Sequence, residues 1–287
     1  MEYVVVSVFV PPDTGPLRGG NPLAVFPEAS SLDSSQMQAI AQSFNLSETT
    51  FVTSHGADSY ELRIFTPAEE LPFAGHPTIG TSWVLNELGL TSEEKLKQHS
   101  RAGTTPVWRA GENWWFERGG QVSNDLEERD LDARDKLARA LGLETTEIGL
   151  EARELGRAGR LRPAFADAGV GQLMVPLRDV AALGRISVRA DLLTRWSGGA
   201  YCFTATGAGR IRARGLFPGY GIAEDPATGS AAAGLGILLA DRLGAIEFEI
   251  LQGLELKRPS RILVHAEPGR VEVGGVCAPI SNGSLHE

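Results

Sequence analysis

Two acidic residues stand where a carboxylate could move a proton. Glu48 lies between a polar turn and an apolar stretch, where partial removal from water would raise its pKa and suit it to proton transfer. Asp225 lies beside a glycine-rich turn. Carboxylates on opposite walls of a closed cleft would make an acid–base pair. The alternative for Glu48 is a solvated acid at a strand edge, and for Asp225 an ordinary turn residue.

The glycine-rich turn beside Asp225 occurs twice. In both copies, Pro72–Gly80 and Pro226–Gly234, a proline is followed by glycine three and eight residues later. An acid stands two residues before each proline, and an Arg-x-x-x-Pro stretch lies upstream of each. Gly75 and Gly229 have no Cβ and would let the backbone pass close to a ligand. Two copies of one turn predict two like halves that face one cleft.

Each turn is predicted to begin a helix. His76 before Pro77 is typical of a cap followed by proline at the first helical position, and Ser230 before three alanines is typical of an N-cap. The free N–H groups and partial positive charge of a helix start attract carboxylate or phosphate. His76 and Ser230 could therefore contact an anion or only cap their helices. Ser230 is a poor candidate nucleophile, because no G-x-S-x-G elbow is present.

The pattern of apolar residues predicts the elements that position these turns. Residues 59–65 alternate between apolar and polar, as a half-buried strand does, and Asp33 can cap a helix that ends near residue 44. Residues 231–240 are apolar on nearly all sides. Such a helix must be buried, and it is too short to cross a membrane, so we expect strands to wrap around it.

The fold class predicted from these elements is α/β (α+β). We expect two pseudo-symmetric domains, each a rolled β-sheet or barrel around a central apolar helix. The N-terminal domain is expected to span residues 1–120 and the C-terminal domain residues 121–274. The segment 275–287 is expected to return to the first domain.

The composition limits the class of protein. A net charge of −9 and a pI of about 5.2 argue against a nucleic-acid binder. No apolar run has transmembrane length, and the apolar N-terminus lacks the basic region of a signal peptide, so we expect a cytoplasmic protein without a membrane partner. Cys202 and Cys277 have no metal-type or redox spacing, and the five histidines form no metal motif. No metal is expected.

The same residues belong to a longer series of motifs. The series consists of GNPLAVF at 20–26, NLSETTFV at 45–52, RIFTP at 63–67, FAGHPTIG at 73–80, EDPATGS at 224–230, and QG at 252–253 with RPS at 258–260. Together and in this order, the motifs resemble the PhzF-like family of phenazine biosynthesis along most of the chain. The resemblance implies the diaminopimelate-epimerase-like fold, in which each of two α/β domains is a barrel-like sheet around a central helix.

The resemblance also implies roles for individual residues. Glu48 would be the catalytic acid/base and Asp225 would assist it. The substrate carboxylate and its neighbours would be held by Gly75, His76, Gly229 and Ser230, with Ser47 and Gly169 as further contacts in the cleft. The implied reaction is a cofactor-free isomerisation, in which a proton leaves one carbon of dihydro-hydroxyanthranilate and returns elsewhere on the conjugated system. A homodimer is also implied. The substrate of this chain is not fixed by the resemblance.

The related epimerases carry a thiol just before the glycine of each turn. The corresponding residues here are Ala74 and Thr228, which cannot form a thiolate base, and both cysteines lie outside the turns. A two-thiol racemase is therefore not expected. We expect a cofactor-independent isomerase acting on a small carboxylate. One alternative is an epimerase or racemase with Glu48 and Asp225 as its bases. The other is a non-catalytic protein that binds small anions.

Overall fold

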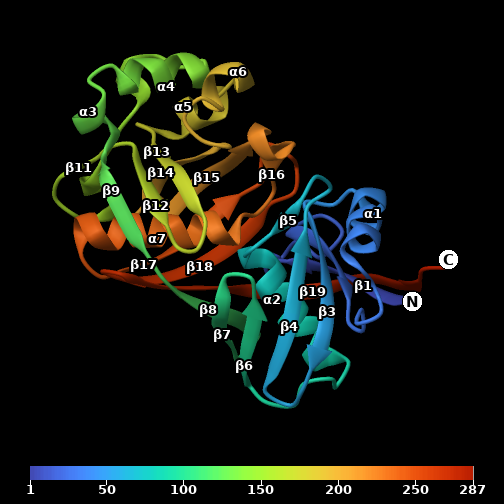
Figure 1. The fold of residues 1–287 in the computed structure, drawn as a ribbon. Coiled ribbons are helices and arrows are strands. Elements are labelled where there is room, and N and C mark those ends of the chain that lie inside the picture. Colours follow the sequence, from blue (N-terminus) through green and yellow to red (C-terminus); the bar gives the residue numbers. More distant parts are fainter. Residues whose placement is uncertain (287) are drawn as a thin grey trace.

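The computed structural model describes residues 1–286, which form two barrels that lie side by side (Figure 1). The first barrel is a closed ring of eight strands. In ring order these are β1 (Glu2–Val8), β2 (Asn21–Phe26), β3 (Glu48–His55), β4 (Ser59–Phe65), β6 (Lys95–Ser100), β7 (Gly103–Ala110), β8 (Asn113–Gly119) and β19 (Arg270–Ser284). Helix α2 (Gly75–Glu87) lies inside this ring, and most of its residues are buried.

The second barrel repeats this order around helix α7 (Gly229–Leu243). Its strands are β9 (Gln121–Asp125), β12 (Ala164–Asp167), β13 (Gly171–Pro176), β14 (Ala200–Gly207), β15 (Arg210–Phe217), β17 (Ile246–Gln252), β18 (Ser260–Glu267) and β19; each pairs with the next, and within residues 1–286 no ladder joins β19 to β9. All residues of α7 from Gly229 to Ala240 are buried, as the apolar sequence predicts. The prediction of an α/β fold with a rolled sheet around each apolar helix is therefore confirmed.

The pairing pattern is the same in both barrels. The parallel pairs β2–β3 and β4–β6 of the first barrel correspond to β13–β14 and β15–β17 of the second. A short strand pairs antiparallel with β4 and with β15 just before each central helix; these are β5 (Glu70–Leu71) and β16 (Ile222–Asp225). The sequence repeat is therefore a repeat of whole strand–turn–helix units.

The arginine and the acid of each repeat stabilise its short strand. Arg63 donates to both carboxylate oxygens of Glu70, at 2.9 and 2.7 Å, and Arg214 donates to both oxygens of Glu224, at 3.0 and 2.8 Å. Two parallel hydrogen bonds between a guanidinium and a carboxylate fix both position and orientation. These pairs hold β5 and β16 in place, and the glycine turns follow directly.

Two strands cross between the barrels. Residues 270–276 of β19 pair with β8 and β18, and residues 277–284 continue into the first barrel and pair with β1. In the other direction, β8 belongs to the first barrel, and β9 follows it and pairs with β12 of the second. The first ring is thus closed by β19, a strand that also belongs to the second sheet.

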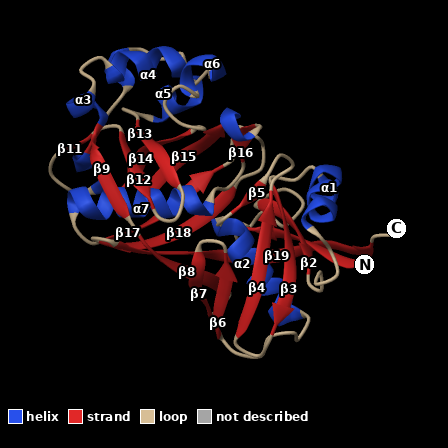
Figure 2. Cartoon of the chain, in the orientation of Figure 1, coloured by secondary structure: helices blue, strands red, loops and turns tan. Residues whose placement is uncertain are grey.

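The remaining elements lie outside the rings. Helix α1 (Ser34–Phe44) packs beside the first barrel, and its Asp33 cap is confirmed as a capping box with Gln36. The helices α3 (Leu126–Arg129), α4 (Ala133–Leu141), α5 (Val180–Arg185) and α6 (Ala190–Leu193) gather at one end of the second barrel (Figure 2). The same region holds short 3₁₀ turns at Thr145–Glu147 and Ala152–Leu155 and the hairpin β10 (Leu150–Glu151) and β11 (Arg160–Leu161). A further 3₁₀ turn, Pro218–Tyr220, precedes β16. No helix within residues 1–286 is long and apolar enough to span a membrane.

The predicted caps of the central helices are wrong by two residues. The extended residues before the helices are Ala74 and Thr228, so helix α2 begins at Gly75 and α7 at Gly229. Pro77 is consequently the third helical residue of α2. The side chains of His76 and Ser230 lie inside the first turns, where they are free to contact other groups.

Candidate active site

The starts of the two central helices touch. A Cβ built on Gly75 would lie 2.5 Å from the carbonyl carbon of Gly229, and one built on Gly229 would lie 2.9 Å from the backbone nitrogen of His76. Contacts this short leave no room for a side chain. The approach of one helix to the other therefore accounts for both glycines, and a close approach of a ligand to them stays a prediction.

The meeting of two helix starts concentrates positive charge. The first N–H groups of each helix have no partner within the helix, and each start carries about half a positive charge. Two such ends side by side repel each other unless negative charge lies nearby. The place where α2 and α7 meet is therefore suited to carboxylates and to an anionic ligand.

A pocket of about 330 Å³ lies beside these helix starts. The first half contributes residues from β3 and from the chain before α2, and the second half contributes residues around β13, β16 and α7. Its polar lining comprises Glu48, Thr66, Glu69, Glu70, Gln172, Asp225, Thr228 and Ser230. The apolar lining includes Phe73, Val170, Phe217, Tyr220 and Ile222. No Lys or Arg among the described side chains lines this pocket, but the guanidinium of Arg118 lies against two of its lining residues, Phe73 and Gly169.

Glu48 is the first residue of β3, and its carboxyl group is 12% exposed. Its Oε2 lies 3.3 Å from Nδ1 of His76 and has no hydrogen bond of good geometry within the described residues. Burial, and secondly the charge of Asp225, raise the pKa of Glu48 well above its usual range. A carboxyl group in this environment keeps its proton to a higher pH than a solvated acid does, and it can exchange that proton with a ligand.

Asp225 ends β16 and is 4% exposed. Its Oδ1 accepts hydrogen bonds from Asn21 and Ser47, each at 2.9 Å, and its Oδ2 accepts one from the Thr228 hydroxyl at 2.6 Å. Burial raises the pKa of Asp225 to about 6, and these three donors act in the opposite direction. Asn21 and Ser47 belong to the first half, so the carboxylate of the second half is held by donors from both.

The two carboxyl groups differ in how their charges are stabilised. Asp225 accepts three strong hydrogen bonds, whereas Glu48 lacks comparable donors and experiences the charge of Asp225. Two interacting carboxyls lose their protons in two separate steps. Asp225 ionises first, and the proton that remains on the pair is held by Glu48. The arrangement thus leaves one proton on the carboxyl that lacks strong hydrogen-bond donors.

His76 is 2% exposed, and burial lowers its pKa to about 3. The imidazole is therefore neutral, and its 3.3 Å contact with Glu48 is not an ion pair. Asn21 Nδ2 lies 3.4 Å from the same Nδ1. In the tautomer with Nδ1 unprotonated, this nitrogen faces the carboxyl of Glu48 as an acceptor, and the proton stays on Glu48.

The other predicted site residues are near, but not all line the pocket. Gly169 lines it and has a φ of +107°, where a side chain would be strained. Ser230 lines it and accepts from Gln172 at 3.3 Å. Ser47 donates a hydrogen bond to Asp225. Gly75, His76 and Gly229 belong to the helix starts beside the pocket. The structure therefore brings all eight predicted residues together around one pocket.

Several residues of the site were not singled out from the sequence. The sequence motifs contain Asn21 and Gln252 but predict no role for either residue. Thr228 is notable in the sequence only because it stands where the related epimerases carry a thiol. No local sequence pattern marks Gln172 or the aromatic residues of the pocket as part of a site, because their partners lie far away in the chain. The sequence feature that could have marked them is a polar amide at the first or last position of an apolar strand: Asn21 begins β2 and Gln252 ends β17.

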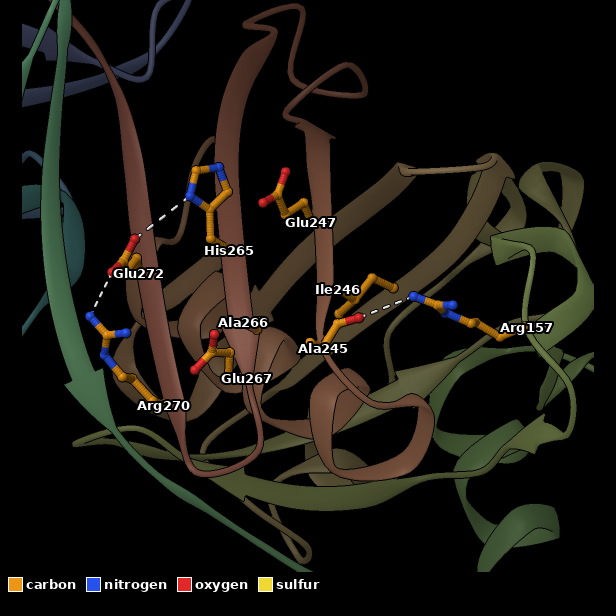
Figure 3. A pocket seen from close by; sticks show the side chains of 9 residues that line it. All are labelled: Arg157, Ala245, Ile246, Glu247, His265, Ala266, Glu267, Arg270 and Glu272. Carbon is orange, nitrogen blue, oxygen red and sulfur yellow. Dashed lines mark hydrogen bonds and ion pairs between the residues drawn. The ribbon is translucent and has the colours of Figure 1, made fainter.

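A second hollow, of about 440 Å³, lies on the outer faces of β17, β18 and β19 (Figure 3). Some of its charged side chains are paired. Glu272 contacts both His265 and Arg270, and Arg157 donates to the carbonyl of Ala245. The hollow contains no residue of either glycine turn. Within residues 1–286 no three His, Cys, Asp or Glu side chains are grouped to hold a metal ion.

Comparisons with known proteins agree with this architecture. A family model described as phenazine biosynthesis-like protein matches residues 13–283. A trans-2,3-dihydro-3-hydroxyanthranilate isomerase from Pseudomonas chlororaphis is 35% identical, with 99% of each chain covered. The solved structure of a predicted epimerase from Pseudomonas aeruginosa is similar with a TM-score of 0.77 and 30% identity, covering 99% of this chain and 98% of that one. A PhzF-family structure from Bacillus anthracis has a TM-score of 0.80 at 20% identity, covering 100% and 99%.

The two matched barrels and these relatives define the class of protein as an isomerase with an epimerase-like α/β fold. The chain belongs to the phenazine biosynthesis-like (PhzF) family, as its motifs predicted.

Proposed function

We propose that this isomerase moves a proton between two carbons of a small, carboxylate-bearing metabolite, with Glu48 as the acid/base and without a cofactor. The observation that carries the proposal is the buried carboxyl of Glu48, which lines the pocket, lacks strong hydrogen-bond donors, and has a raised pKa. A raised pKa makes the ionised form a stronger base. The relative that acts on trans-2,3-dihydro-3-hydroxyanthranilate supports a substrate of that type.

The proposed step balances on one proton. The ionised carboxylate of Glu48 takes a proton from a substrate carbon, and the electron pair of that C–H bond spreads over the conjugated system. Glu48 then returns the same proton to a different carbon, so the substrate is isomerised and the enzyme is restored. The N–H groups at the starts of α2 and α7 would stabilise the negative charge that develops. Asp225 stays ionised and keeps Glu48 basic.

The pocket lining supports a compact, partly apolar substrate. The apolar parts of Phe217, Tyr220 and Ile222 would face a six-membered ring, and the helix starts offer N–H donors to its carboxylate. Enclosure by side chains from both barrels would exclude water from the carbanion.

The direct test is NMR in D2O with trans-2,3-dihydro-3-hydroxyanthranilate and a panel of other small cyclic and amino carboxylates. The wild type is expected to introduce deuterium at carbon. Glu48→Gln is expected to slow this by about 10²–10⁴-fold, the usual contribution of a general acid or base, while ligand binding persists. Glu69→Gln is the matched control, because Glu69 is an exposed acid of the same pocket. Full activity of Glu48→Gln would refute the assignment.

An epimerase reaction is the second candidate. It is favoured by the likeness to a predicted epimerase and by the presence of two carboxyl groups, one from each half, in the same pocket. The position of the label separates the two reactions: deuterium at an inverted stereocentre indicates epimerisation, and deuterium with a moved double bond indicates isomerisation. A homodimer and a cytoplasmic location remain predictions, and light scattering would test the former.

A further inference from the structure

Gln252 is the last residue of β17 and is fully buried near the pocket. Both the oxygen and the nitrogen of its side-chain amide form hydrogen bonds. Its Oε1 accepts from the Tyr201 hydroxyl at 2.8 Å and from the backbone N–H of Thr228 at 3.2 Å. Its Nε2 donates to the backbone carbonyl of Asp225 at 2.8 Å and to the Thr228 hydroxyl at 3.0 Å. A single side chain thus contacts Asp225, which precedes the second glycine turn, and Thr228, which lies within it.

The orientation of this amide is fixed by its backbone partners. A backbone N–H can only donate, so the atom facing Thr228 N must be the oxygen. A carbonyl can only accept, so the atom facing Asp225 O must be the nitrogen. Rotating the amide by 180° would break both hydrogen bonds and leave buried polar groups without partners, which is costly.

This orientation determines where the Thr228 hydroxyl points its proton. The hydroxyl oxygen must accept from Nε2 of Gln252, because that nitrogen has only hydrogens to offer. The one hydroxyl proton is then available for Oδ2 of Asp225, 2.6 Å away. The space that the two side chains occupy is kept open by Gly215, where a Cβ would lie 2.7 Å from the Thr228 hydroxyl and 3.0 Å from Nε2.

We propose that Gln252 is a positioning residue, whose Nε2 donor forces the Thr228 hydroxyl to donate to Asp225 and so keeps that carboxylate ionised beside Glu48. The inference rests on the proposed function, since it concerns the carboxyl pair that would move the proton. Gln252 itself does not line the pocket, so it acts through Thr228 and not on the substrate.

The charged and titratable groups that face Asp225 are few. They are Glu48 from β3, Tyr201 from β14 and the neighbouring Glu224, whose charge is paired with Arg214; His76 is linked to Asp225 through Asn21. Gln252→Met adds no charge and leaves all of these in place, so a shift in the titration of Asp225 in that variant would report the hydrogen bond from Thr228, whereas Gln252→Glu also adds a negative charge of its own.

The test is the titration of the Asp225 carboxyl carbon by ¹³C NMR in the full chain, with Asp225→Asn to assign the signal. Gln252→Glu keeps the shape but replaces the donor with a charged acceptor, toward which the Thr228 hydroxyl would turn. We expect the pKa of Asp225 to rise by at least about one unit, a tenfold change in proton affinity.

Tyr201→Phe is the matched control, because it removes a hydrogen bond to the Oε1 side of the same amide and leaves the donor side intact. It should leave the titration of Asp225 where it is in the wild type. If Gln252→Glu does not fold, Gln252→Met removes the donor without adding charge and should move the pKa in the same direction by a smaller amount, about threefold in proton affinity.

The outcomes are distinct. Equal shifts in the glutamine and tyrosine variants, or no shift in either glutamine variant, would show that Gln252 only supports the fold and would overturn the inference. If the wild type exchanges no deuterium with any carboxylate, the proposed function fails, but the NMR titration still decides whether Gln252 controls Asp225.

Discussion

At the scale of residues, the two carboxyl groups occupy positions that are not equivalent in the two halves. The repeat places Asp225 opposite Leu71, since Glu224 and Glu70 are the matched acids before them. In the matched first turns, His76 stands opposite Ser230. The symmetry of the backbone therefore builds one pocket from two helix starts, and the differences between the halves supply its chemistry.

The effect of Asp225 on Glu48 gives a prediction with a definite sign. Glu48 must lose its proton before it can accept one from carbon, so activity should rise with pH along a limb set by the pKa of Glu48. Burial and the charge of Asp225 place this limb above the usual carboxyl range. Asp225→Asn removes the charge, which lowers the pKa of Glu48 and moves the limb to lower pH. The plateau rate should fall by about tenfold, because a base of lower pKa is weaker.

The measurement is kcat/KM for deuterium exchange as a function of pH in the wild type and in Asp225→Asn. Glu69→Gln should leave the limb in place, since that acid is exposed at the rim of the pocket. A limb that stayed in place or moved upward in Asp225→Asn would mean that Asp225 does not raise the pKa of Glu48.

At the scale of elements, the contact between α2 and α7 leads to a prediction about a single methyl group. Gly75→Ala would place its Cβ 2.6 Å from the backbone nitrogen of Ser230, and backbone atoms of a buried helix cannot move aside easily. We expect a loss of about 1–3 kcal/mol of stability, as for other overpacked sites, and a fall in exchange rate because the helix starts are pushed apart.

Gly184→Ala is the control for that substitution. Gly184 lies in α5, and a Cβ there would have no neighbour within 4 Å. Replacing this helical glycine should stabilise the protein by about 0.5–1 kcal/mol. Thermal unfolding followed by circular dichroism checks both variants, and equal Tm changes in the two would contradict the packing argument.

Local patterns predicted the elements well, and contacts over long distances decided the rest. The alternation at 59–65 and the apolar run at 231–240 reflect which sides of each element are buried. Burial of this kind can therefore be predicted from the sequence alone. The helix starts were misplaced because cap preferences could not reveal that Gly75 and Gly229 touch. Gln252 and Asn21 were given no role for the same reason, since their partners are 24 to 206 residues away.

At the scale of the whole molecule, the crossing strands tie the stability of each barrel to the other half of the chain. The ring of the first barrel closes only because residues 277–284 pair with β1, from Cys277 opposite Val8 to Ser284 opposite Glu2. Arg258 of the second half adds hydrogen bonds to the carbonyls of Pro16, Leu17 and Gly20, which lead into β2. The barrels should therefore unfold together, in one cooperative transition.

A chain that ends at Val276 tests this dependence. It loses one of the two partner strands of β1, so this strand, in which Val6, Ser7 and Val8 are buried, would become an unpaired edge. It keeps residues 270–276, which pair with β8 and β18, so the second ring retains all its ladders. We expect the first barrel to lose a stability of about 5–15 kcal/mol, that of a whole domain, and calorimetry to show the second barrel melting separately. Exchange activity should vanish, because Asn21, Ser47 and Glu48 lie in the unfolded part.

A control chain that ends at Leu285 keeps the entire strand and should melt like the wild type. A single transition near the wild-type Tm in the shorter chain would show that the crossing strand is dispensable.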